Sequence, residues 1–279
     1  MIRLTCLVDN CVRHGSSLRG EHGFSFYIET PSGDVLFDAG QSGEVLLHNA
    51  KKMDIDLAGV ASLALSHAHY DHTGGLIHFF KLIRRKIPLF ANPDLLRPRY
   101  SVREDQAIEI GLRIPAYIFS QKADLRLNAE PSQILPGVFT SGEVKERNQS
   151  EGRSPHHFIY SDGNWIPDPY KDDLSLVIET SSGLILLCGC CHAGLLNALA
   201  HVQREFHQDI RAVIGGTHLA SCSQETLAHT IEILGGQGQK QVPFFYLNHC
   251  SGERALVALA QAFGERAQTC PAGTVLSFN

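Results

Sequence analysis

The chain has 279 residues, of which 43% are hydrophobic, so it holds enough apolar material for the core of one enzyme-sized domain. A formal net charge of -5 at pH 7 gives no reason to expect nucleic acid or an acidic membrane surface as a partner. No apolar run approaches the roughly 20 residues of a membrane-spanning helix, and charged residues interrupt the N-terminal apolar residues, so we expect neither a membrane span nor a signal peptide. Cys188, Cys190 and Cys191 crowd together, unlike the cysteines of a secreted disulfide framework, which favours a cytoplasmic protein.

The first elements in chain order are strands joined by turns. Residues 2–8 and 23–30 have the apolar pattern of strands, and residues 35–38 form the hairpin partner of the second one. A helix is expected from about 42 to 53. Asp38 ends the third strand, either as a turn residue or as a carboxylate that orients a metal-binding histidine.

The most informative stretch is 63–76, where a buried strand ends in three histidines and an aspartate and a helical pattern follows. If the backbone is still extended at His67 and His69, their side chains leave on the same side and can share one ion. Asp71 and His72 then fall in the first turn of the helix, where they can meet a second ion. Imidazole and carboxylate suit zinc and also iron or manganese. We therefore predict a catalytic metal site, because a histidine-rich loop that binds nothing would not explain four ligand-type side chains at one strand end.

Residues 87–91 have the pattern of the next buried strand, whereas the signal from 93 to 173 is weak. We expect short strands and loops there, as an insertion that shapes the substrate pocket. Its polar groups of interest are His156, His157, Asp172 and Asp173. The paired histidines lie in a proline-containing loop, which is more typical of surface residues than of ligands. The two aspartates precede another strand and either approach the site or cap that strand.

Three more strand–turn–helix units follow, and a histidine comes after each strand. The strands are expected at 184–188, 210–214 and 242–247, and the histidines are His192, His218 and His249. Because α/β folds build their sites at such strand ends, these histidines are predicted to join the first cluster. The turn at 189–194 lacks the lysine of a phosphate-binding loop, and the cysteine spacing around it does not fit a structural zinc knot.

Together these motifs resemble the metallo-β-lactamase-fold superfamily, whose HxHxDH signature is matched from His67 to His72. They also resemble, in the same order along the chain, the subgroup labelled 7,8-dihydropterin-6-methyl-4-(β-D-ribofuranosyl)-aminobenzene-5'-phosphate synthase-like. The matching segments are 21–25, 36–41, 66–75, 172–173, 189–194, 215–219 and 249–252. The resemblance covers essentially the whole chain. It departs from the subgroup at Cys191 and Ser251, where serine and threonine are usual, and these changes spare the ligand-type atoms.

The resemblance implies an α/β fold with a four-layer αββα sandwich, formed as one domain over 1–279 with the pocket-shaping insertion at about 93–173. It also implies two divalent metal ions, with zinc as the first expectation and iron or manganese as alternatives. The first ion would be held by His67, His69 and His192, and the second by Asp71, His72 and His249. Cys190 lies where many relatives carry a bridging aspartate, so it is a candidate thiolate ligand. His218 is assigned to substrate binding or proton donation, with metal ligation as the alternative.

The expected function is a dinuclear metal-dependent hydrolase of a small molecule, with a metal-activated hydroxide as the attacking group. Asp71 would orient that hydroxide and His218 would protonate the leaving group, which makes them the candidate catalytic residues. A phosphoester or cyclic phosphodiester fits the subgroup, although a lactone or thioester fits the same chemistry. The alternatives are a pterin-pathway synthase, a non-catalytic ligand-binding sensor and, with less support, a di-iron redox enzyme. We expect no nucleic-acid or membrane partner, and a homodimer is left open.

Overall fold

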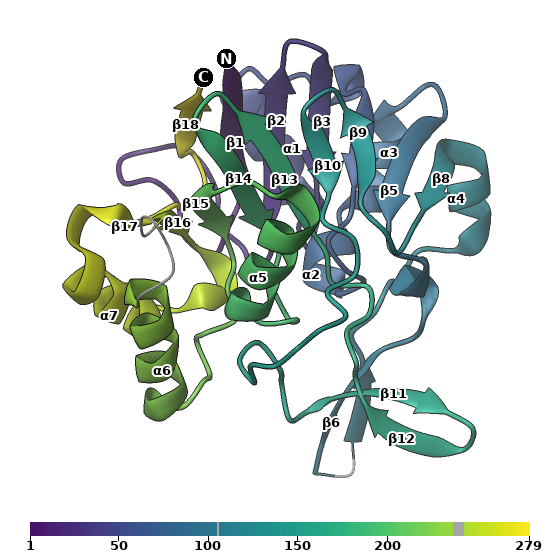
Figure 1. The fold of residues 1–279 in the computed structure, drawn as a ribbon. Coiled ribbons are helices and arrows are strands. Elements are labelled where there is room, and N and C mark those ends of the chain that lie inside the picture. The colour runs from purple at the N-terminus through teal and green to yellow at the C-terminus, as the bar shows by residue number, and fades with distance from the viewer. Residues whose placement is uncertain (105, 237–242) are drawn as a thin grey trace.

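The computed structural model describes residues 1–104, 106–236 and 243–279, and these form three β-sheets with helices outside them (Figure 1). The first sheet has the order β18-β1-β2-β3-β4-β5-β8. Its strands are β1 (Ile2–Val8), β2 (Ser25–Thr30), β3 (Gly33–Phe37), β4 (Ser62–Ala64), β5 (Ile87–Ala91), β8 (Ala123–Leu127) and β18 (Val275–Phe278). The second sheet has the order β17-β16-β15-β14-β13-β10-β9. Its strands are β9 (Ser132–Leu135), β10 (Val138–Thr140), β13 (Ser175–Thr180), β14 (Gly183–Cys188), β15 (Ile210–Gly215), β16 (Phe244–Leu247) and β17 (Ala267–Thr269).

The helices cover the outer faces of these two sheets. They are α1 (Glu44–Lys52), α2 (Tyr70–Thr73), α3 (Leu76–Leu82), α4 (Ala116–Lys122), α5 (Leu195–Phe206), α6 (Gln224–Gly235) and α7 (Glu253–Phe263). One core lies between α1, α3 and α4 and the first sheet, and another lies between α5, α6 and α7 and the second sheet. No described helix is both long and apolar enough to cross a membrane.

A third core lies between the two sheets, and the period-two alternation of side chains along a strand produces it. In β14, Leu184 and Leu186 pack toward α5, whereas Ile185 and Leu187 pack toward the first sheet. Because β14 is buried on both faces, it is apolar throughout rather than alternating. Helices, sheet, sheet and helices therefore form four layers, and the predicted αββα sandwich is confirmed.

The interval 93–173 divides its strands among all three sheets. β8 joins the first sheet, and β9 and β10 join the second. The rest forms the small sheet, with the order β12-β11-β6-β7, from β6 (Tyr100–Arg103), β7 (Gln106–Glu109), β11 (His157–Ser161) and β12 (Asn164–Pro167). This small sheet projects beyond the sandwich at the end where α2 lies (Figure 1). That the whole chain is one domain with an insertion there stays a prediction.

The first helix after the histidine cluster is interrupted by two glycines. α2 ends at Thr73 and α3 begins at Leu76, with Gly74 and Gly75 between them. A Cβ atom at Gly75 would lie 2.0 Å from the carbonyl oxygen of Ala39, so no other residue fits without moving the backbone. This close approach brings the short α2 against the end of β3, which positions the histidine cluster beside Asp38.

Candidate metal centre

The predicted ligand residues come from three strand ends and meet in one place. His67 and His69 follow β4, His192 follows β14, and His249 follows β16. β14, β15 and β16 run parallel, so the loops after them lie at the same edge of the second sheet. The cavity at this edge has a volume of about 300 Å³. Its lining includes His69, Asp71, Cys190, His192, His218 and His249.

The first set of ligand-type atoms is His67, His69 and His192. One ring nitrogen of each lies within 4.8 Å of the other two, and Nε2 of His67 lies 3.0 Å from Nδ1 of His69. Zinc–nitrogen bonds of 2.0–2.1 Å in a tetrahedron would place two ligand nitrogens about 3.3 Å apart. The spacing of this set therefore matches a shared ion.

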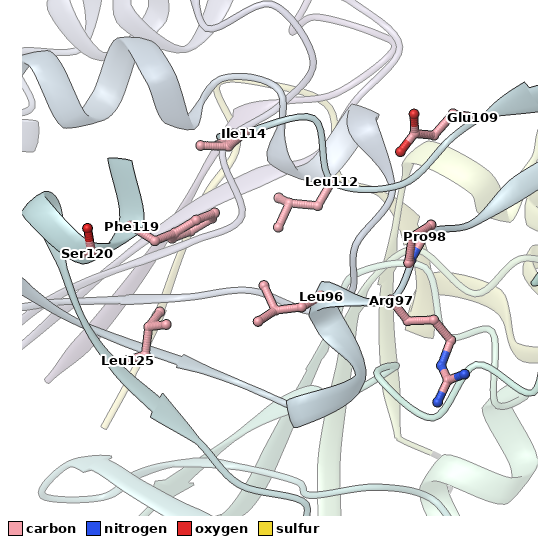
Figure 2. A pocket seen from close by; sticks show the side chains of 9 residues that line it. All are labelled: Leu96, Arg97, Pro98, Glu109, Leu112, Ile114, Phe119, Ser120 and Leu125. Atoms are coloured by element: carbon pink, nitrogen blue, oxygen red, sulfur yellow. The ribbon is translucent and has the colours of Figure 1, made fainter. Parts of the chain in front are cut away.

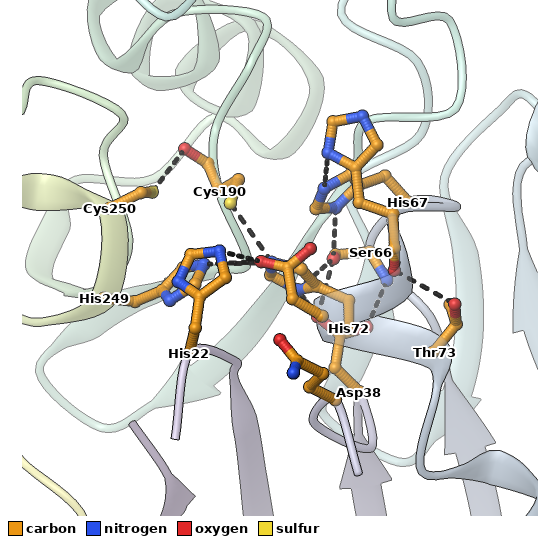
Figure 3. Close-up of polar contacts among 12 residues, drawn as sticks. His22, Asp38, Ser66, His67, His72, Thr73, Cys190, His249 and Cys250 are labelled. Carbon is orange, nitrogen blue, oxygen red and sulfur yellow. Dashed lines mark hydrogen bonds and ion pairs between the residues drawn. The ribbon is translucent and has the colours of Figure 1, made fainter. Parts of the chain in front are cut away.

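The second set is Asp71, His72 and His249. Asp71 Oδ2 lies 3.7 Å from Nε2 of His72 and 3.3 Å from Nε2 of His249, and the two ring nitrogens are 3.3 Å apart. Cys190 lies between the two sets, because its Sγ is 3.1 Å from Nε2 of His72 and within 4.8 Å of His67. Figure 3 shows the side chains of His72, His249 and Cys190 directed at one another across the cluster.

Hydrogen bonds fix which nitrogen of His67 and His72 faces the centre. Asp38 Oδ2 accepts from Nδ1 of His72 at 2.7 Å and from Ser66 Oγ at 2.6 Å. Since the Ser66 hydroxyl gives its hydrogen to Asp38, its oxygen accepts from Nδ1 of His67 at 2.8 Å. Each ring therefore carries its proton on Nδ1, and the lone pair of its Nε2 points into the cluster.

His192 and His249 are held in the same way. The Gly152 carbonyl accepts from Nδ1 of His192 at 3.1 Å, and Asn10 Oδ1 accepts from Nδ1 of His249 at 3.1 Å. Nε2 of His192 is buried, and no described residue gives it a hydrogen bond. Four imidazole lone pairs thus converge beside a carboxylate, an arrangement that is repulsive without a shared cation or proton. The donor set fits divalent metal ions of the kind that imidazole, carboxylate and thiolate bind.

The protonation states agree with this description. Burial, together with neighbouring histidines, holds the pKa of His67 and His192 well below the usual range, so both rings are neutral ligands at pH 7. Burial also lowers the pKa of His249, but the hydrogen bond to Asp71 and the negative charges around the ring together outweigh burial and raise the pKa to about 9. The second set therefore favours a positive charge at Nε2 of His249, and a metal cation would supply it. Burial raises the pKa of the Cys190 thiol, which only a cation would reverse.

At the strand ends that form the centre the backbone is strained at four non-glycine residues, and Tyr170 beside them also has a left-handed φ, of 46°. Asp38, Cys191, His218 and His249 have φ values of 58°, 61°, 50° and 50°, in the left-handed region that L-residues rarely adopt. Such strain persists only where the surrounding structure enforces it, and it is concentrated at functional sites. All four residues lie at or next to the converging strand ends.

The roles that the sequence left open at 172–173 are now visible. Asp172 Oδ2 accepts from the backbone N–H of Ala68 at 2.8 Å, and Asp173 Oδ2 accepts from that of Ala193 at 2.8 Å. Each carboxylate thus holds the loop that carries a ligand-type histidine. Asp172 in turn lies 2.6 Å from the buried guanidinium of Arg99, which also contacts two further aspartates.

The predicted histidine pair at 156–157 separates. His156 is exposed, whereas His157 lines the cavity with its ring centre 5.0 Å from that of His69. Tyr170 lies parallel to His192, with ring centres 4.4 Å apart, and its hydroxyl is 3.0 Å from Nδ1 of His157. Burial and the neighbouring His218 lower the pKa of His157 to about 4.

Sequence reasoning did not single out several residues of this centre, among them His22, Ser101, Arg103, Tyr170 and Cys250. Nε2 of His22 lies 3.3 Å from Asp71 Oδ2, and Sγ of Cys250 accepts from the backbone N–H of His218 at 3.3 Å. His22 belongs to a matching segment of the resemblance, and that was the one available signal for it.

A second cavity, of about 320 Å³, has a different character. Its apolar wall consists of Leu96, Leu112, Ile114, Phe119 and Leu125 (Figure 2). Arg97 and Glu109 lie at its side, and the Arg97 side chain points away from that wall (Figure 2). None of the predicted site residues lines it, so the candidate chemistry belongs to the first cavity.

The comparisons with known proteins agree with the fold. A model described as the metallo-beta-lactamase superfamily matches residues 18–138, and the chain belongs to that superfamily. It is 29% identical over 287 residues to the 7,8-dihydropterin-6-methyl-4-(beta-D-ribofuranosyl)-aminobenzene-5'-phosphate synthase of Methanocaldococcus jannaschii, covering 99% of this chain and 97% of that one. An uncharacterised protein of the same organism is 31% identical over 257 residues, covering 91% and 93% of the two chains.

A solved structure described as a metal-dependent hydrolase of the beta-lactamase superfamily superposes with a TM-score of 0.83 at 26% identity. The match covers 100% of both chains. The family resemblance inferred from the sequence motifs is therefore confirmed, and relatives that are named as enzymes support an enzyme.

Proposed function

We propose that this protein is a dinuclear metal-dependent hydrolase of a phosphorylated small molecule, either a phosphoester or a cyclic phosphodiester. One observation carries the proposal: imidazole Nε2 atoms converge beside the Asp71 carboxylate in a cavity of about 300 Å³. A cavity of that size suits a small-molecule substrate. The similarity to a metal-dependent hydrolase over the full chain supports the same class of reaction.

The ligand roles follow the two sets of atoms. The first ion would be held by His67, His69 and His192, and the second by Asp71, His72 and His249. Cys190 would contact both, because its Sγ lies beside His72 and within reach of His67. We expect zinc, with iron or manganese as alternatives, because the nitrogen, oxygen and sulfur donors suit all three.

Two divalent ions would supply Lewis acidity and lower the pKa of a bound water. The chain itself supplies orientation and proton transfer. Asp71 is the carboxylate that orients the attacking water, since it is the one carboxylate among the described residues that line the cavity. His218 also lines the cavity, with its ring centre 4.3 Å from that of His192, and its Nδ1 is buried without a partner among the described residues. We assign His218 to donating the proton that the leaving group needs.

A second candidate function is a pterin-pathway synthase of the dihydropterin-ribofuranosylaminobenzene phosphate type. The full-length similarity to the synthase of Methanocaldococcus jannaschii favours it. Turnover of the pterin precursor by purified protein would support this function, whereas phosphodiester hydrolysis without precursor turnover would exclude it. In either case we place the protein in the cytoplasm, where its free cysteines stay reduced.

The proposal is tested by metal content and by hydrolysis of bis(4-nitrophenyl) phosphate, before and after chelation. We expect about two ions per chain and a rate that disappears on chelation and returns with metal. His67→Ala and Asp71→Ala should lose metal and activity together, whereas His156→Ala should keep both because His156 is exposed outside the cavity. If His67→Ala or Asp71→Ala retained both ions and full activity, the assigned site would be wrong. Protein that binds no metal would favour a non-catalytic sensor.

A further inference from the structure

The small sheet presents three hydrogen-bond donors to the cavity of the histidine cluster. Ser101 and Arg103 lie two positions apart on β6, so their side chains leave on the same face of the sheet. His157 on β11 is directly opposite Ser101 in the antiparallel pairing, so it shares that face. All three residues line the cavity. The sheet thus forms a wall beside the candidate metal centre.

The hydrogen-bond network orients the donor of His157. The backbone N–H of Ser154 donates to the Tyr170 hydroxyl oxygen at 3.2 Å, and that hydroxyl lies 3.0 Å from Nδ1 of His157. If Nδ1 carried the ring proton, the hydroxyl oxygen would accept twice, and its own hydrogen would have no acceptor among the residues that the structure describes. The hydroxyl therefore donates to Nδ1, and the ring proton lies on Nε2. His157 Nε2 is then a donor available to a ligand in the cavity.

The wall formed by the small sheet carries a positive charge that no carboxylate neutralises among the described residues. Among the described residues, Arg103 forms no ion pair. Asp71 is the one carboxylate of the described cavity lining, and it belongs to the second ligand set. A guanidinium, a hydroxyl and an imidazole N–H together complement an oxyanion, and a guanidinium binds phosphate through two parallel hydrogen bonds.

We propose that Arg103, Ser101 and His157 bind a phosphate monoester group of the substrate that is not the group being cleaved. This inference rests on the proposed function, because it assumes that the scissile bond lies at the histidine cluster. Three separate donors suit the three terminal oxygens of a phosphate monoester better than the two of a carboxylate. The substrate is therefore a small molecule with its reactive ester at one end and a phosphate at the other. Tyr170 is a positioning residue, since it acts through His157.

The test compares phosphonate ligands, which are not hydrolysed, on the metal-loaded full-length protein. Methylphosphonate carries one anionic group, and a short series of α,ω-alkanediphosphonates carries two. Calorimetry should show that the best diphosphonate binds roughly tenfold or more tightly than methylphosphonate, as expected for an added charged hydrogen-bonded contact. Arg103→Gln should abolish that gain and leave methylphosphonate affinity unchanged. Metal content is measured after each titration, so that removal of metal by the ligand is detected.

Matched variants distinguish the loss of a hydrogen-bond donor from a general effect of substitution on the fold. Arg126→Gln removes an exposed arginine outside the cavity and should keep the gain. His157→Gln retains a donor near the position of Nε2 and should keep most of the gain, whereas His157→Phe should lose it. The proposal is overturned if diphosphonates bind no more tightly than methylphosphonate, or if Arg103→Gln keeps the full gain. An equal gain with phosphonocarboxylates would overturn the assignment to phosphate.

The failure of this inference and of the proposed function are distinguishable. If methylphosphonate does not bind but diphosphonates bind in an Arg103-dependent way, the phosphate subsite stands and the hydrolytic centre is wrong. If methylphosphonate binds and bis(4-nitrophenyl) phosphate is hydrolysed, but diphosphonates gain nothing, the hydrolase stands and the subsite is wrong.

Discussion

Asp38 Oδ2 lies 2.7 Å from Nδ1 of His72, and both side chains are fully buried. The bond fixes the ring proton on Nδ1 and aims Nε2 at the cluster. Asp38 has a left-handed φ of 58°, which asparagine also tolerates, so Asp38→Asn preserves the backbone and removes the charge. We expect metal affinity to fall by about 10- to 100-fold, the usual cost of losing such a partner. Competition with a chromophoric chelator measures the metal affinity, with the exposed Asp124→Asn as the control. Equal metal affinities of Asp38→Asn and the wild type would contradict the role of Asp38.

Arg99 is the buried cation that holds the loop aspartates. Its guanidinium is fully buried and lies 2.9 Å, 3.0 Å and 2.6 Å from Asp94, Asp168 and Asp172. Arg99→Met keeps the apolar stem but leaves the buried Asp168 and Asp172 without their cation, whereas Asp94 keeps its ion pair with Arg97, so we expect a loss of about 3–5 kcal/mol in the free energy of unfolding. Urea denaturation measures it. Arg126→Met, which breaks an exposed ion pair, should cost no more than about 1 kcal/mol. Equal effects of the two substitutions would rule out the buried network.

Asp173 makes stability depend on pH. Burial raises its pKa to about 6 against the opposing effect of the Ala193 N–H, and its Oδ1 is buried without a partner among the described residues. Because the unfolded carboxyl titrates near about 3.9, the folded state binds more protons between these values. The contribution of Asp173 to the free energy of unfolding is therefore fully present below the pKa of the unfolded carboxyl and is lost as pH rises through about 6. The unfolding free energy of the wild type should fall relative to that of Asp173→Asn over this interval. Denaturation of both proteins at matched pH tests this, and a constant difference would refute it.

Because Gly189 has no side chain, the loop after β14 can lie close to Ser66 and Asp38. A Cβ atom there would lie 2.2 Å from Ser66 Oγ and 3.1 Å from Asp38 Oδ2. Gly189→Ala should therefore displace the serine that orients His67, with a loss of about 1–3 kcal/mol in the free energy of unfolding and weaker metal binding. Gly235→Ala is the matched control, because its Cβ would meet Phe263 at an ordinary 3.4 Å at the end of α6. Thermal denaturation and metal content distinguish them, and a stable, metal-replete Gly189→Ala would show that the space is not required.

The sequence predicted what depends on local spacing. The alternation and apolar runs placed β1, β3, β5 and β14 close to where they lie, and the spacing of His67, His69, Asp71 and His72 predicted members of both ligand sets within one short segment. The strand-end rule then added His192 and His249, because carboxyl ends of parallel strands share an edge.

What escaped prediction depends on contacts between distant segments. His157 looked like a surface residue because its loop is rich in polar residues and proline, and only the pairing of β11 with β6 carries it to the cavity. Arg99 gave no signal, since nothing local indicates that a lone arginine is buried among three aspartates. The division of 93–173 among three sheets was likewise invisible, because strand order is set by tertiary pairing rather than by periodicity.

Each ligand set draws on both sheets of the sandwich. His67 and His69 extend from the first sheet and meet His192 from the second, and Asp71 meets His249 in the same way. Ions bound there would cross-link the two sheets and so stabilise their packing against each other, as structural metal ions do in small metal-binding domains. Neither sheet alone holds a complete triad. Loss of metal would therefore weaken the packing between the two sheets first. The same ions would contribute both to the stability of the fold and to the reaction.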